Sequence, residues 1–202
     1  MSVLAFDFDG VVADTMCFLG GLAVSLLCEE YRMSRSDAQT AYRLTTGVSF
    51  RDQLERLFPG SPLNTLVCRR FRLLRDSRYE SLPEVPGVQG VIGELVRRGY
   101  RCVTLSGTES HVVSGWLQVR GGKLASLLEV LCGDKSGELR RLGSSGPVVF
   151  IGDSLEDAVT AARAGARFVG YAGPGAVTRS EGFEALGLER VTRITDLLVV
   201  LP

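Results

Sequence analysis

Two aspartates, Asp7 and Asp9, stand two residues apart, just after a short apolar segment at residues 3–6. The segment predicts a buried parallel strand, and Gly10 permits a sharp turn just beyond the two carboxylates. Like charges at one strand end repel each other and lose hydration when buried. A divalent cation resolves this conflict, and Mg²⁺ prefers carboxylates, water and phosphate oxygens. The pair therefore indicates a metal-assisted phosphate site rather than turn and cap residues.

A second pair of carboxylates, Asp153 and Asp157, follows the apolar residues 147–151. Residues 155–164 predict a helix, which places Asp157 in its first turn. Because the two aspartates are four residues apart, a helical turn can bring them side by side. Asp157 has a second interpretation, which is stabilisation of the helix N-terminus by a negative charge. The two roles are compatible.

Four segments of the chain together resemble the motifs of the haloacid dehalogenase superfamily. Residues 7–15 match D-x-D-G-x-x-x-D-[ST], and residues 152–157 match G-D-S-x-x-D. Ser106 ends the apolar strand 102–105, as the second motif requires, and Lys135 lies where a third-motif lysine is expected. The resemblance covers nearly the whole chain. It is greatest to hydrolases with a C1-type helical cap, which are phosphoglycolate phosphatase-like or β-phosphoglucomutase-like.

The resemblance implies a role for each motif residue. Asp7 would be the nucleophile that forms an aspartyl phosphate, and Asp9 would act as general acid and then as general base. Ser106 would donate its hydroxyl to a phosphate oxygen, and Lys135 would neutralise charge on the transferring phosphoryl group. Asp157 would support the metal or orient the lysine. The implied Mg²⁺ ligands are Asp7, Asp9 through its backbone carbonyl, Asp153 and Asp157.

The third motif departs from the family pattern. Many relatives have Lys-Pro after a glycine-rich approach, whereas here Ser136 follows Lys135. The only other lysine, Lys123, lies beside a Gly-Gly break before the third core strand. Lys135 is therefore the candidate for the cationic role.

Substrate binding is expected from both the core and the cap. We assign it to Phe8 and Gly107 in the core and to Thr46, Gly47 and Arg51 in a cap turn. Residues 47–52 are similar to the Gly-Val-Ser-Arg stretch of β-phosphoglucomutase caps, but Phe50 interrupts the match and weakens the mutase hypothesis.

The pattern of elements predicts an α/β fold. Strands and helices alternate after about residue 83, which favours a doubly wound, Rossmann-like parallel sheet. Residues 15–82 have a helical pattern and are expected to form a small α-helical cap domain inserted after the first strand. The core domain would comprise residues 1–14 and 83–202.

One cap helix carries an arginine-rich run at residues 69–75. The apolar residues of this helix fall on one face, so the arginines predict a solvated face rather than an anion-binding patch. The apolar residues are Leu63, Leu66, Val67, Phe71 and Leu74.

Composition limits the partners. The chain of 202 residues has a formal net charge of zero, which gives no global field for nucleic acid or an anionic membrane. Its five cysteines are odd in number and scattered, and the N-terminus lacks a secretory signal pattern. A single histidine excludes a histidine-rich metal site. We expect a cytoplasmic monomer or homodimer that acts on a small phosphorylated metabolite.

The leading hypothesis is a Mg²⁺-dependent phosphatase. Alternatives are a phosphosugar mutase and a non-catalytic phosphate-binding protein, although the complete motifs argue against the latter. Dehalogenase chemistry is disfavoured because those relatives lack the aspartate found here at Asp9. Phosphonate cleavage in this superfamily uses a cap lysine, and no lysine occurs between Thr15 and Leu82.

Overall fold

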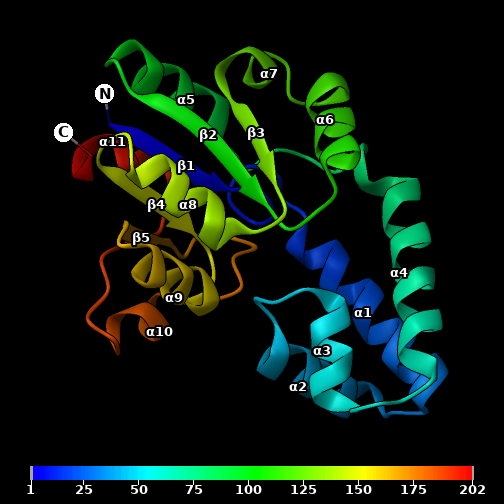
Figure 1. Cartoon of the computed structure of the whole chain (residues 1–202). Coiled ribbons are helices and arrows are strands. Elements are labelled where there is room, and N and C mark those ends of the chain that lie inside the picture. The colour runs from blue at the N-terminus through cyan, green and yellow to red at the C-terminus, as the bar shows by residue number, and fades with distance from the viewer. Residues whose placement is uncertain (1, 202) are drawn as a thin grey trace.

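A six-stranded parallel sheet forms the centre of the computed structural model, which describes residues 2–201 (Figure 1). The strand order is β3-β2-β1-β4-β5-β6, so the chain reverses its direction of winding between β1 and β4. Ligands of such sheets bind outside the strand ends at this switch point. The strands are β1 (Val3–Asp7), β2 (Arg101–Ser106), β3 (Glu129–Cys132), β4 (Val148–Gly152), β5 (Arg167–Tyr171) and β6 (Arg190–Val191).

Both faces of the sheet are covered, which explains why β1 is apolar at every position before its aspartate. Leu4 and Phe6 point into one core cluster, and Val3 and Ala5 point into another, as strand alternation requires. The first cluster packs against α5 (Val88–Arg97), α6 (Ser110–Val119), α7 (Leu124–Leu127) and α11 (Leu197–Val200), and the second against α8 (Lys135–Gly143) and α9 (Leu155–Ala164). The predicted doubly wound sheet is confirmed. The remaining short helices are α10 (Ser180–Glu184) and η1 (Ile194–Asp196).

Four helices lie between β1 and α5 in sequence and form a separate layer at one end of the sheet (Figure 1). We call them the cap helices. They have their own apolar cluster, in which Leu27, Leu54 and Phe71 are buried. Ser34 and Ser49 each accept a hydrogen bond from a backbone N–H three residues later, which caps α2 and α3. The cap helices are α1 (Met16–Tyr31), α2 (Arg35–Thr45), α3 (Phe50–Leu57) and α4 (Leu63–Tyr79).

The two connections between cap and core are hydrogen-bonded to each other. Asp14 N–H donates to the Pro83 carbonyl at 2.9 Å, and Val85 N–H donates to the Val12 carbonyl at 2.9 Å. The chain therefore leaves and re-enters the core at one place, directly beyond the β1 aspartates.

The buried face of α4 differs from the predicted one. Leu66 is 57% exposed and Leu74 is 40% exposed, whereas Asn64 and Arg75 are buried. Polar groups occupy this face because partners satisfy them; the Asn64 amide, for example, donates to Glu55 at 2.8 Å and to the Phe58 carbonyl at 2.9 Å. The interpretation of the whole arginine run as solvated is consequently wrong for Arg75.

No helix within residues 2–201 combines the length and apolarity needed to cross a bilayer.

We predict that Trp116→Phe lowers the free energy of unfolding by about 1–3 kcal/mol. Trp116 is fully buried, packs edge-on against Phe8 and donates from Nε1 to the Leu82 carbonyl at 2.8 Å. Urea denaturation measures the loss. Val119→Ala is the matched control on α6, because Val119 is 61% exposed, and an equal loss in that variant would contradict this assignment.

Candidate active site

A cavity of about 530 Å³ lies between the carboxyl ends of the strands and the cap helices. This is the position expected for a ligand site at the switch point. The predicted residues that line it are Asp7, Asp9, Gly107, Lys135, Asp153 and Asp157 from the core and Thr46, Gly47 and Arg51 from the cap.

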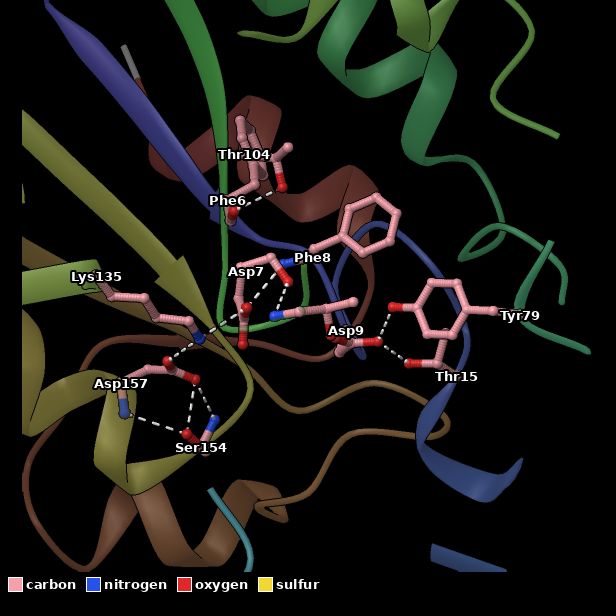
Figure 2. Close-up of polar contacts among 12 residues, drawn as sticks. Phe6, Asp7, Phe8, Asp9, Thr15, Tyr79, Thr104, Lys135, Ser154 and Asp157 are labelled. Carbon is pink, nitrogen blue, oxygen red and sulfur yellow. Dashed lines mark hydrogen bonds and ion pairs between the residues drawn. The ribbon is translucent and has the colours of Figure 1, made fainter. Parts of the chain in front are cut away.

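Asp7 ends β1 and is held by two donors. Its Oδ1 accepts from the Phe8 backbone N–H at 2.7 Å and lies 2.8 Å from Lys135 Nζ (Figure 2). Lys135 begins α8, and its ammonium also lies 2.9 Å from Asp157 Oδ1. The lysine thus joins the carboxylate at the end of β1 to one in the first turn of α9, although its motif is incomplete.

The electrostatics of this group follow from its burial. Burial raises the pKa of Asp7 well above its usual value, the Asp157 charge raises it further, and Lys135 opposes both. Burial alone would lower the pKa of Lys135, but the charges of Asp157 and Asp7 outweigh this effect and raise the pKa. The lysine is therefore charged at neutral pH.

Three buried carboxylates suit a divalent cation. Asp7, Asp153 and Asp157 each offer an oxygen, and these oxygens lie within 4.8 Å of one another. Burial raises the pKa of Asp153 to about 8, and the Asp157 charge contributes to this shift. One ammonium group cannot balance three carboxylates, and a hard divalent cation supplies the missing charge. The donor set therefore fits Mg²⁺.

Gly10 is required beside this cluster. Its φ is +83°, and a Cβ atom at this position would lie 2.3 Å from Asp153 Oδ2. A side chain would collide with the carboxylate and would also strain the backbone. This close approach explains the glycine after the two β1 aspartates.

Asp157 caps a helix and also contacts Lys135. Its Oδ2 accepts from the backbone N–H and the hydroxyl of Ser154, at 3.2 and 2.6 Å, which caps α9. Its Oδ1 faces Lys135. The capping interaction at the start of α9 thereby holds Asp157 in place on one side of the carboxylate cluster.

The Asp9 carboxylate is turned away from this cluster, toward the cap (Figure 2). Its oxygens accept from Thr15 Oγ1 at 2.7 Å, from the Tyr79 hydroxyl and from Thr108 Oγ1 at 3.1 Å. Tyr79 is the last residue of α4 and is fully buried. Asp9 therefore contacts both ends of the cap insertion.

The remaining predicted core residues lie deeper. Ser106 is 1% exposed, and its Oγ accepts from the Thr108 N–H at 3.0 Å. The Phe8 side chain is in the hydrophobic core, stacked against Tyr79, so a substrate contact at Phe8 is limited to its backbone. Gly107, which lies between Ser106 and Thr108 in the sequence, lines the cavity.

Several cavity residues were not predicted. Arg72, Arg75, Thr108 and Glu109 all line the cavity, and Tyr79 contacts Asp9. Thr108 lies two residues after Ser106, so the second motif could have indicated that Thr108 lies near the site. The buried face of α4 carries Phe71, Arg75 and Tyr79 at intervals of four residues. This helical spacing is a sequence signal that could have placed Arg75 and Tyr79 on the same face as Phe71.

No family model and no curated protein matches the chain. Solved structures match nearly all of it. A haloacid dehalogenase-like hydrolase from Streptococcus pneumoniae has a TM-score of 0.81 at 11% identity, covering 100% of this chain and 99% of the other. A predicted phosphoglycolate phosphatase from Haemophilus somnus has a TM-score of 0.75 at 16% identity, covering 99% and 97%.

A third similar structure carries a ligand. CbbY from Rhodobacter sphaeroides, in complex with xylulose-1,5-bisphosphate, has a TM-score of 0.70 at 21% identity, covering 96% of this chain and 95% of its own. On these comparisons, the chain has the fold of the haloacid dehalogenase-like hydrolases, as its motifs predict.

Proposed function

We propose that this protein is a Mg²⁺-dependent phosphatase that hydrolyses a small phosphomonoester through an aspartyl-phosphate intermediate. The observation that carries the proposal is the buried Asp7 carboxylate, held by Lys135 at 2.8 Å inside a cluster of carboxylates that suits a metal. Proteins of the same fold include one named as a predicted phosphoglycolate phosphatase and one that binds a sugar bisphosphate.

The first step transfers the phosphoryl group to Asp7. Its Oδ1 is occupied by the Phe8 N–H and by Lys135, so Oδ2 is the attacking atom. The new bond joins Oδ2 to phosphorus, and the bond between phosphorus and the leaving oxygen breaks. Asp9 gives a proton to that oxygen, which requires its carboxyl group to turn from Tyr79 into the cavity.

The second step releases phosphate. Asp9 takes a proton from water, the water oxygen attacks phosphorus, and the bond between phosphorus and Asp7 breaks. Lys135 neutralises the transferring group in both steps, and the Gly107 N–H and the Ser106 hydroxyl bind its oxygens. Ser106 Oγ accepts from the Thr108 N–H, so its own proton stays available for a phosphate oxygen once the hydroxyl turns toward the cavity.

The metal would be held by Asp7, Asp153 and Asp157 and by the backbone carbonyl of Asp9. A bound Mg²⁺ supplies positive charge that lets the nucleophile and the phosphate approach each other.

The proposal also covers the division into domains, the cap residues that contact the substrate and the location of the protein. We propose that residues 15–82 act as a cap domain on the core formed by residues 1–14 and 83–202, and that Thr46, Gly47 and Arg51 contact the substrate. All three line the cavity. The five free cysteines support a reducing, cytoplasmic location.

We predict that Asp7→Asn lowers phosphate release at least about a thousandfold while the protein stays folded, because the amide cannot act as the nucleophile. Phosphate release is measured on a panel of sugar phosphates, phosphoglycolate, nucleotides and an aryl phosphate, with Mg²⁺ and with EDTA. Asp37→Asn, at an exposed position on α2, is the matched control. Wild-type turnover by Asp7→Asn would exclude the covalent mechanism.

We predict that Mg²⁺ raises the Tm of the wild-type protein and not that of Asp153→Asn. Without metal the folded pKa of Asp153 is about 8, above its usual 3.8, so its contribution to stability is present below about pH 4 and is lost as pH rises toward 8. In EDTA at pH 7 the variant should therefore melt at a higher temperature than the wild type. Asparagine keeps an acceptor for the Val177 N–H, which lies 2.9 Å from Asp153 Oδ2.

Thermal denaturation with and without Mg²⁺ measures both effects. Equal Mg²⁺ shifts in the two proteins would remove Asp153 from the metal site, and a lower Tm of the variant in EDTA would contradict the charge argument.

A further inference from the structure

The cap wall of the cavity carries two arginines on α4, Arg72 and Arg75. They are three residues apart, so their side chains leave the same side of the helix. Tyr79, which contacts Asp9, lies one turn beyond Arg75 on this side. With a rise of about 1.5 Å per residue, the two arginines stand about 6 and 10 Å from Tyr79 along the helix axis. The two arginines and Asp9 therefore line the same cavity.

Arg75 is a buried cation with two carboxylate partners. It is 7% exposed, its Nε lies 2.7 Å from Asp76 Oδ1, and its Nη2 lies 2.7 Å from Glu109 Oε2. The other oxygen of Glu109, Oε1, lies 3.5 Å from Arg72 Nε. One carboxylate thus stands between two guanidinium groups. Guanidinium forks match carboxylate and phosphate oxygens, so Glu109 occupies the place that such an anionic group of a ligand would take.

Glu109 is placed to give way to a ligand. It belongs to the core, follows the cavity-lining residues Gly107 and Thr108, and lines the cavity itself. Its side chain is 38% exposed, and its two ion-pair partners are the α4 arginines. The pair with Arg72 is long and exposed and contributes little to holding the carboxylate, so the 2.7 Å pair with the buried Arg75 is the contact that a ligand anion must replace.

The other charged residues of the cap that line the cavity do not lie between Arg72 and Arg75 as Glu109 does. Asp52 also lines the cavity, but its Oδ2 accepts from the Ser49 hydroxyl at 2.6 Å at the start of α3. Arg51 also lines the cavity, and its charge acts on Glu55 rather than on Glu109. Glu109 is therefore the carboxylate that Arg72 and Arg75 share.

We propose that Arg72 and Arg75 form a subsite for a second anionic group of the substrate, and that Glu109 holds the place of this group in the free protein. The inference rests on the proposed phosphatase function. The substrate class is a small metabolite with a phosphomonoester at one end and a carboxylate or a second phosphate at the other. A cavity of about 530 Å³ accommodates a molecule of this size.

The test compares kcat/KM for matched pairs of substrates that differ in the second anionic group. One pair is phosphoglycolate and 2-hydroxyethyl phosphate, and the other is fructose 1,6-bisphosphate and fructose 6-phosphate. The wild-type protein should prefer the doubly anionic member of at least one pair, and the pair that shows the preference distinguishes a carboxylate from a phosphate.

Two variants should shift this preference in opposite directions. Arg72→Gln should lower the preference about five- to tenfold, mainly through KM, since it removes a charged hydrogen-bond donor. Glu109→Gln should lower KM for the doubly anionic substrate, because it removes the competing charge. Arg69→Gln, at an exposed α4 position outside the cavity lining, is the matched control and should leave the preference unchanged. A purely structural role of these residues would not produce opposite signs.

The subsite is wrong if the wild-type protein hydrolyses both members of each pair equally, or if Arg72→Gln behaves like Arg69→Gln, and either result leaves the phosphatase proposal intact. If no member is hydrolysed, the phosphatase proposal fails, and calorimetric binding of the same pairs decides the subsite. Tighter binding of the doubly anionic member to the wild type than to Arg72→Gln supports the subsite, and equal affinities overturn it.

Discussion

The structure depends on a charge imbalance buried at the ends of β1 and β4. Asp7, Asp153 and Asp157 converge there, and Lys135 is a cation that contacts Asp7 and Asp157. Such an arrangement is unfavourable for folding on its own, because each carboxylate loses water and faces its neighbours. It persists because the sheet, the start of α9 and the start of α8 hold the groups in place. A site with these energetics is ready for a cation and an anionic substrate, since both relieve the imbalance.

The sheet supplies the rigidity that this imbalance requires. In β1, alternate side chains are buried on opposite faces, so the strand cannot slip without exposing one set. Its register with β4 pairs Phe6 with Ile151, which brings Asp7 level with the start of the turn that carries Asp153. The positions of the carboxylates are thus a direct consequence of two apolar strands lying side by side.

The sequence allowed the convergence of these carboxylates to be predicted, because the motifs that carry them follow hydrophobic runs that define strand ends. Lys135 was placed even though its motif is loosened, since the chain contains one other lysine. The α4 face was not predicted correctly. Periodicity assigned Leu66 and Leu74 to the core, whereas the burial of Arg75 depends on Glu109, a partner 34 residues away. A local pattern does not contain partners at that distance.

The orientation of Asp9 is the other feature that local patterns could not supply. Its three hydroxyl donors come from the start of α1, the end of α4 and the turn after β2, and Tyr79 lies 70 residues away in the chain. Because α1 and α4 are the two ends of the cap insertion, a displacement of the cap would change the donors around this carboxylate. The ion pair between Arg75 and Glu109 also joins α4 to the core. A ligand anion that replaced Glu109 would therefore act on the helix that positions Tyr79, and substrate recognition and alignment of the acid–base group would share one element.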